Sequence, residues 1–185
     1  LVNLGNPANP KSLLLAPRAT QHLGLDTDLS RGRADYPTSL MGSIALARQT
    51  LLDARWYRAA TAAPARDAAT RERPEPNATL EALLPVLDGS QPVICQARDE
   101  QDYRRIDRLA KEFGLRAAIL GNGYEYRRTA HLKAAAMPVI VPVAYPAPPE
   151  VDDPDWALDS PLDALQHWEQ APSNLAWLVG AGVPV

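Results

Sequence analysis

A chain of 185 residues with 46% hydrophobic and 22% charged residues has the composition of an ordinary globular protein and is long enough to bury a core. Its net charge of −3 offers no electrostatic basis for binding nucleic acid, so we expect no nucleic-acid partner. The single cysteine, Cys95, excludes an internal disulfide and a cysteine metal cluster. No apolar run is long enough to cross a bilayer, so we expect no membrane span.

We interpret the chain as a single domain that is a fragment of a larger protein. The chain begins with leucine rather than methionine, and its last three residues, 183–185, are typical of the beginning of a strand. The pattern of Pro, Gly and apolar residues divides this domain, residues 1–185, into three parts. It predicts an irregular lead-in over 1–35, a helical part over 36–90 and a part made of βα units over 91–185.

The helical part opens with a helix start signal, since either Thr38 or Ser39 can cap free backbone amides. Apolar residues then repeat at helical spacing and predict a helix to about Ala60 with Trp56 on its apolar face, the other apolar positions being Leu40, Ile44, Ala47, Leu51 and Leu52. A proline-rich connection leads to a second helix over residues 78–87, which Pro85 should kink or shorten.

The βα part contains three apolar runs that alternate with two amphipathic segments, the pattern of parallel strands joined by crossover helices. The first run begins at Pro92, the second covers 116–120 and the third covers 138–143. The first helix between them, capped by Asp99 and ended by Gly114, should bury Tyr103, Ile106, Leu109, Ala110 and Phe113. The fold class that we predict is α/β, with parallel βα units of a partial TIM-like barrel whose strand edges are exposed or covered.

The C-terminal part predicts a loop followed by two helices. Residues 144–155 are rich in Pro and Asp and predict the loop. One helix should begin at Ser160-Pro161, and the last should begin at 172–174 and end at Gly180 or Gly182.

Functional groups in open α/β sheets and barrels follow the C-terminal ends of strands. The residues there are Gln96, Arg98, Gly121, Asn122 and Tyr145, and none of them is a histidine or a carboxylate. We therefore predict no catalytic residue and no metal ligand in this chain. An arginine such as Arg98 is suited to hold a carboxylate or phosphate, so the candidate binding residues are Gln96, Arg98, Asn122 and Tyr145.

Other motifs have structural interpretations that we favour over chemical ones. The turn Gly121-Asn122-Gly123 resembles a phosphate-binding turn, but Tyr126 stands where the dinucleotide fingerprint has its third glycine, which favours a plain tight turn. The carboxylates of residues 99–102 favour helix capping, and those of 152–155 lack the spacing of a calcium loop. No zinc-binding spacing joins the three histidines, His22, His131 and His167.

Several blocks resemble one family. Residues 36–49, from Tyr-Pro-Thr-Ser-Leu-Met-Gly onward, together with 52–57, resemble the long helix of imidazolonepropionase-like members of the amidohydrolase superfamily. Residues 92–143 are similar to the fifth, sixth and seventh barrel units of that family, and residues 165–185 are similar to the run into its last strand.

The resemblance implies a metal site in active members, with ligands from an early His-x-His, from one His after each of the fifth and sixth strands, and from an Asp after the eighth. Gln96 corresponds to the fifth-strand His and Gly121, next to Asn122, to the sixth-strand His. Neither residue replaces imidazole as a zinc ligand. The remaining ligands would lie before Leu1 and beyond Val185, so the chain resembles a degenerate copy.

The expected function is that of a non-catalytic scaffold or interaction module of a larger hydrolase, with the remainder of the same polypeptide as its partner. We expect no cofactor in this chain, zinc only in the full-length protein, and a periplasmic or secreted location, which the resemblance alone implies. Exposed strand edges predict edge pairing, homo-oligomerisation or coverage by the N-terminal segment. Two alternatives stay open: part of a metal-dependent hydrolase acting on C–N bonds, or an α/β domain that binds a small molecule or anion.

Overall fold

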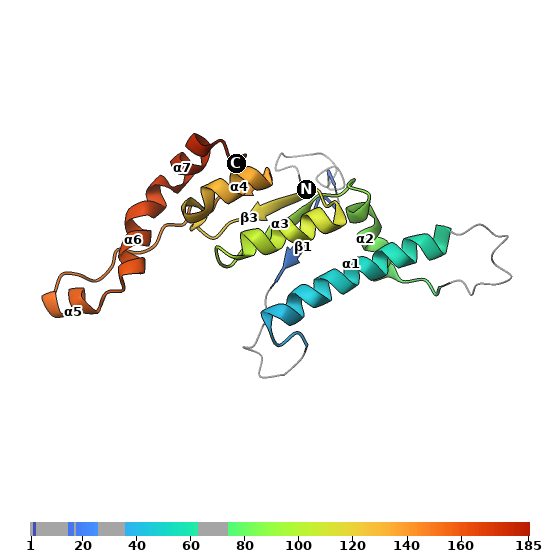
Figure 1. Ribbon diagram of the computed structural model, residues 1–185, viewed down its shortest axis with the longest axis horizontal. Coiled ribbons are helices and arrows are strands. Elements are labelled where there is room, and N and C mark those ends of the chain that lie inside the picture. The colour runs from blue at the N-terminus through green and yellow to red at the C-terminus, as the bar shows by residue number, and fades with distance from the viewer. Residues whose placement is uncertain (1, 3–14, 17, 26–35, 63–73) are drawn as a thin grey trace, which may run out of the picture. The chain divides into compact units, whose positions relative to one another are not determined.

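The computed structural model describes residues 2, 15–16, 18–25, 36–62 and 74–185 (Figure 1). The chain divides into two compact units, which we describe separately. The first unit contains the residues up to Ile94 together with Leu109–Arg116, and the second contains Cys95–Arg108 and Ala117–Val185.

The strands form a parallel sheet in the order β1-β2-β3-β4, comprising Gln21–Gly24, Val93–Gln96, Ala117–Leu120 and Val139–Ile140. Register between the last two strands pairs Ile119 with Val139. The predicted α/β class with parallel strands is therefore confirmed. Strand β1 was not predicted, because its pairing is non-local: the Gln21 amide donates to the Pro92 carbonyl at 2.9 Å.

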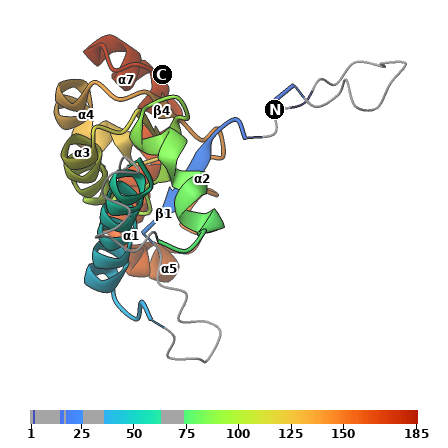
Figure 2. The same cartoon turned by 90° about the vertical axis from the view of Figure 1, so that its right-hand side faces the viewer.

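Two helices of the first unit, α1 (Leu40–Ala62) and α2 (Ala78–Leu87), lie side by side in both views (Figures 1 and 2). The predicted cap of α1 is confirmed for Ser39, whose Oγ accepts a hydrogen bond from the Gly42 amide at 3.1 Å. Helix α1 ends two residues later than predicted. Trp56 is 60% exposed, so its assignment to the buried face of α1 is wrong.

The core of the first unit lies where α1 meets the end of helix α3 (Asp102–Phe113). Leu51, Leu109 and Phe113 are buried together. The buried face of α1 runs through positions 51, 54 and 57, which are three residues apart, and this spacing turns Trp56 away from the core. All five residues predicted to be buried on α3 are buried, and Gly114 follows it with a φ of 66°, as expected of the C′ position.

The second unit continues from β3 through a 3₁₀ helix, η4 (Glu125–Arg128), and a short helix, α4 (Thr129–Ala135). After β4 it ends in the helices α5 (Pro154–Asp159), α6 (Leu162–Gln170) and α7 (Asn174–Ala181), with the 3₁₀ helix η5 (Ala171–Ser173) between the last two. Strand β4 is shorter than the predicted run over 138–143. The carbonyl of Pro184 accepts a hydrogen bond from the Val139 amide at 2.9 Å, so the end of the chain approaches β4.

Helix α5 lies partly in the predicted loop 144–155. Its start is capped by the Asp153 carboxylate, which accepts from the Asp155 amide at 2.8 Å, and Pro154 occupies the first turn. Helix α7 begins at Asn174 as predicted and is followed by Gly182 at a φ of 77°. None of the helices in the described part of the chain has both the length and the apolarity that crossing a membrane requires.

Candidate functional site

The ends of strands β2 and β3 lie next to each other within the second unit. Gln96 and Arg98 are exposed at the end of β2. The Asn122 side chain, just after β3, donates from Nδ2 to the Arg98 carbonyl at 2.8 Å. Two of the four candidate binding residues, Arg98 and Asn122, are therefore hydrogen-bonded to each other. The bond uses the backbone carbonyl of Arg98 and the side-chain amide of Asn122.

Tyr145 occupies a different feature of the second unit. It is 60% exposed and lines a depression of about 340 Å³ with residues that include Val139, Leu175 and Val185. The depression is mostly apolar, and its polar members include Asn174.

The turn that follows β3 is occupied by a carboxylate that sequence reasoning did not identify. Glu125 is fully buried. Its Oε1 accepts hydrogen bonds from the backbone amides of Asn122, at 2.6 Å, and Gly123, at 3.0 Å. The turn does present backbone amides to an anion, as its resemblance to a phosphate-binding turn suggested, but the anion is a side chain of the same turn.

The backbone of Gly121 has no room for a side chain because of this carboxylate. A Cβ atom on Gly121 would overlap Glu125 Oε1 and lie 2.8 Å from its Cδ. Glu125 stands five residues after the end of β3, and a single buried carboxylate there produces no periodic pattern in the sequence. The glycine at the strand end is the one local signal that a group packs against the backbone there.

Two further side chains complete the surroundings of Glu125. The Tyr103 hydroxyl lies 3.1 Å from Oε1 and 2.5 Å from Asn122 Oδ1, and its single proton serves one of these acceptors at a time. The Asn174 side chain, from the start of α7, donates to Oε2. Burial, followed by the nearby Glu125 charge, raises the pKa of Tyr103 far above its usual value, so this hydroxyl stays protonated and serves as a donor.

The carboxylates before α3 hold the local backbone, as the capping interpretation expected. Asp99 Oδ1 accepts from the amides of Gln101, at 2.7 Å, and Asp102, at 2.9 Å. Asp102 is buried, accepts from the Arg98 amide at 3.0 Å and pairs with Arg105 at 2.7 Å. These groups satisfy amides and a guanidinium, and none of the contacts resembles an acid–base pair aimed at a substrate.

An aromatic cluster lies beside the same turn. The ring of His167, on α6, stacks on Tyr124 with centroids 3.7 Å apart, and its Nδ1 lies 3.4 Å from the Tyr126 hydroxyl. The Arg127 guanidinium lies over Tyr124 at 4.7 Å. Burial and then the Arg127 charge lower the pKa of His167, which favours the neutral form of the ring.

The residues present do not fit the zinc site that the family resemblance implies for active members. Gln96 offers an amide, Gly121 offers no side chain, and the space beside Gly121 holds the Glu125 carboxylate. Among the residues that the structure describes, no group of three or more His, Cys, Asp and Glu side chains is arranged to hold a metal ion. These two strand ends therefore lack the imidazole ligands that a zinc-dependent step would need.

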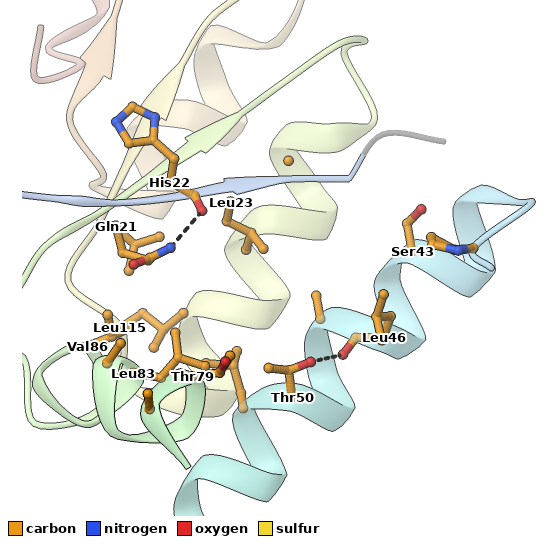
Figure 3. A pocket seen from close by; sticks show the side chains of 17 residues that line it. Gln21, His22, Leu23, Ser43, Leu46, Thr50, Thr79, Leu83, Val86 and Leu115 are labelled. Atoms are coloured by element: carbon orange, nitrogen blue, oxygen red, sulfur yellow. Dashed lines mark hydrogen bonds between the residues drawn. The ribbon is translucent and has the colours of Figure 1, made fainter. Parts of the chain in front are cut away.

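The first unit contains a larger cavity, of about 730 Å³, between β1, α1 and α2 (Figure 3). Its lining is mainly apolar and includes Leu46, Leu83, Val86 and Leu115. The His22 ring points away from it, on the other side of β1, whereas Leu23 points toward the helices (Figure 3). The cavity lies in the layer between strand and helices and was not predicted.

No family model and no curated protein matches this chain. The crystal structure of an amidohydrolase from Thermotoga maritima is similar to it, with a TM-score of 0.69 and 19% sequence identity over 94% of this chain and 42% of that chain. At this identity the similarity shows the fold alone. The chain therefore has an amidohydrolase-like fold, as the sequence resemblance predicted, with the parallel sheet and helices of a partial TIM-like barrel, and spans less than half the length of that protein.

Proposed function

We propose that this chain is a non-catalytic amidohydrolase-like domain that serves as a scaffold or interaction module of a larger hydrolase. The observation that carries the proposal is the packing of Glu125 against Gly121, the position that corresponds by resemblance to the sixth-strand histidine. An imidazole at this position would compete with a buried carboxylate that already accepts three hydrogen bonds and shares the Tyr103 proton with Asn122. The space at the end of β3 is thus filled by Glu125, whose hydrogen bonds stabilise the turn after this strand.

Partner, cofactor and location follow from the same proposal. The partner is the remainder of the same polypeptide, and any zinc belongs to the full-length protein. A periplasmic or secreted location belongs to the proposal through the family resemblance. Strand-edge pairing between copies is a further part of it, supported by the position of β1 and β4 at the two edges of the sheet.

The first test is the metal content of the purified 185-residue chain, measured by elemental mass spectrometry after dialysis and after zinc titration. We expect far less than one zinc per chain. About one tightly bound zinc per chain would contradict the proposal and favour a metal-dependent hydrolase of C–N bonds. The variants His22→Gln, His131→Gln and His167→Gln would then locate the ligands.

A second test separates a scaffold from a binding domain. In the longer hydrolase, Gln96→Ala and Arg98→Ala, both at exposed positions, should leave kcat/KM within about twofold, since surface substitutions away from a site have small effects. The control is Arg104→Ala, on the exposed side of α3. A loss of about tenfold or more with Arg98→Ala alone would instead favour an anion-binding role for the strand ends.

A further inference from the structure

We propose that the turn after β3 is a carboxylate-binding site whose resident ligand is Glu125, and that it binds free acetate when the Glu125 carboxylate is removed. The acetate site and the proposed function share the Glu125–Gly121 contact, but neither requires the other. The groups that bind the Glu125 carboxylate in the native chain would bind a free carboxylate of the same size.

The site is built from four neutral donor groups of the second unit, one of which, the Tyr103 hydroxyl, shares its proton between Glu125 and Asn122. Two are the backbone amides of Asn122 and Gly123, which converge on one oxygen. The other two are the Tyr103 hydroxyl, on α3, and the Asn174 amide, on α7, and both side chains are buried. Successive backbone amides with added side-chain donors form the concave sites that bind anionic oxygens in proteins.

The donors are held in place by contacts that do not involve Glu125. Asn174 Oδ1 accepts from the Tyr126 amide at 2.9 Å, and this bond fixes the orientation in which Nδ2 faces the carboxylate. Asn122 Oδ1 accepts from the Tyr124 amide at 3.1 Å, while its Nδ2 binds the Arg98 carbonyl. The donors should therefore keep their positions when the ligand is removed, which is the condition for binding a free molecule.

The size of the ligand follows from the substitution. Glu125→Ala keeps Cβ and removes a –CH₂–COO⁻ group, whose free counterpart is acetate. Gly121 supplies the space, because it has no Cβ on the side where the carboxylate lies. Acetate fits the vacated volume, formate is smaller, and acetamide has the same shape without the charge.

The experiment measures the melting temperature, Tm, of wild type and Glu125→Ala in sodium acetate, sodium chloride and acetamide at equal concentrations up to about 0.2 M. We expect Glu125→Ala to melt about 5–10 °C below wild type, because buried donors lose their acceptor. Acetate should raise its Tm along a saturating curve, as a ligand of the native state does. Chloride and acetamide should not.

Glu125→Gln is the matched control, since its amide fills the site and leaves no space for acetate. Its Tm should respond equally to acetate and chloride. The proposal is overturned if acetate raises the Tm of Glu125→Ala no more than chloride does, or if wild type and Glu125→Gln show the same acetate-specific rise.

A second pair of variants covers the case in which Glu125→Ala does not fold. Gly121→Ala should lower the Tm, because the new methyl overlaps the carboxylate, whereas Gly180→Ala, where a Cβ meets open space, should not. Combining Gly121→Ala with Glu125→Ala should reduce the penalty of the added methyl and abolish the acetate response. Equal Tm values for Gly121→Ala and Gly180→Ala would contradict the proposed site.

Discussion

The hydroxyl of Tyr57 on α1 donates a hydrogen bond of 2.8 Å to Glu81 Oε1 on α2. The same hydroxyl accepts from the Asn77 amide at 3.2 Å, and Asn77 caps α2 by accepting from the amides of Thr79 and Leu80. One buried phenol thus fixes the start of α2 against the C-terminal part of α1. Its removal leaves both a backbone amide and a carboxylate without this partner.

Tyr57→Phe should lower the free energy of unfolding by about 1 kcal/mol, the usual net contribution of a hydrogen bond, because both partners of the Tyr57 hydroxyl belong to exposed residues that water can reach. The measurement is urea denaturation followed by circular dichroism. Tyr36→Phe is the control, because the Tyr36 hydroxyl also donates one hydrogen bond, to the Gly42 carbonyl at 3.0 Å, but Tyr36 is 63% exposed. Equal losses from the two substitutions would show that the Tyr57 hydroxyl does not hold α2.

Arg55 should stabilise the first unit in a way that lysine cannot reproduce. Its guanidinium lies 4.5 Å from the centre of the Phe113 ring and donates to the Glu112 carbonyl at 3.1 Å. Arg55→Lys should cost about 0.5–1 kcal/mol, because lysine lacks the flat group that stacks and bonds at once. Chemical denaturation tests this, with Arg104→Lys as the exposed control. An Arg55→Lys chain as stable as wild type would contradict the prediction.

Cys95 should be chemically inert in the native chain. Its side chain lies on β2 and is almost fully buried, and burial raises the pKa of its thiol to about 11. Little thiolate therefore exists at pH 7–8, and access is blocked as well. Ellman's reagent should label the chain only as it unfolds, so the labelling rate should rise with urea as the circular dichroism signal falls. Rapid stoichiometric labelling of folded chain would contradict the buried position.

His167 should make the chain less stable in mild acid. Burial and the Arg127 charge lower the pKa of His167 below its unfolded value near 6.5, so the unfolded chain takes up this proton first as the pH falls. The contribution of the neutral ring is complete above pH 6.5 and is lost as the pH falls from there through the folded pKa. The proton chemical shift of His167 Cε1 reports that pKa directly.

Arg127→Gln is the variant that tests this cause. Removing the positive charge should raise the pKa of His167 and reduce the loss of stability between about pH 7 and pH 5. Arg104→Gln, on a different helix, should leave the titration unchanged. An unchanged His167 titration in Arg127→Gln would assign the shift to burial alone.

Local signals in the sequence predicted the elements whose causes are local. The Ser39 cap, the bounds of α2, the buried positions of α3 and the glycine after it all follow from capping chemistry and helical spacing. Helix α5 had a readable signal as well, an Asp153 cap followed by Pro154, but the surrounding Pro and Asp residues favoured a loop. Strand β4 shows the limit of such local signals, since it retains only two of the residues predicted to form a strand over 138–143.

The features that escaped prediction depend on contacts between distant residues. Strand β1 depends on pairing with a segment about seventy residues away. Glu125 looks in the sequence like an ordinary charged residue between two tyrosines, and its burial becomes understandable only when Tyr103 and Asn174 are brought to it. Of the candidate binding residues, the structure joins Arg98 and Asn122 and places Tyr145 in a different depression, a separation that the strand-end pattern gave no reason to expect.

The two ends of the Asn174 side chain bind different atoms of the segment after β3: Oδ1 binds the Tyr126 amide and Nδ2 binds the Glu125 carboxylate. Opening of that segment therefore requires the start of α7 to release it, so the two should exchange with solvent as one cooperative unit. In native-state hydrogen exchange, the amides of Asn122, Gly123 and Tyr126 would show the same opening free energy as those of α7, although they lie outside any strand or long helix. Hydrogen exchange in the turn after β3 would thus measure the stability of α7 at the C-terminal end of the second unit.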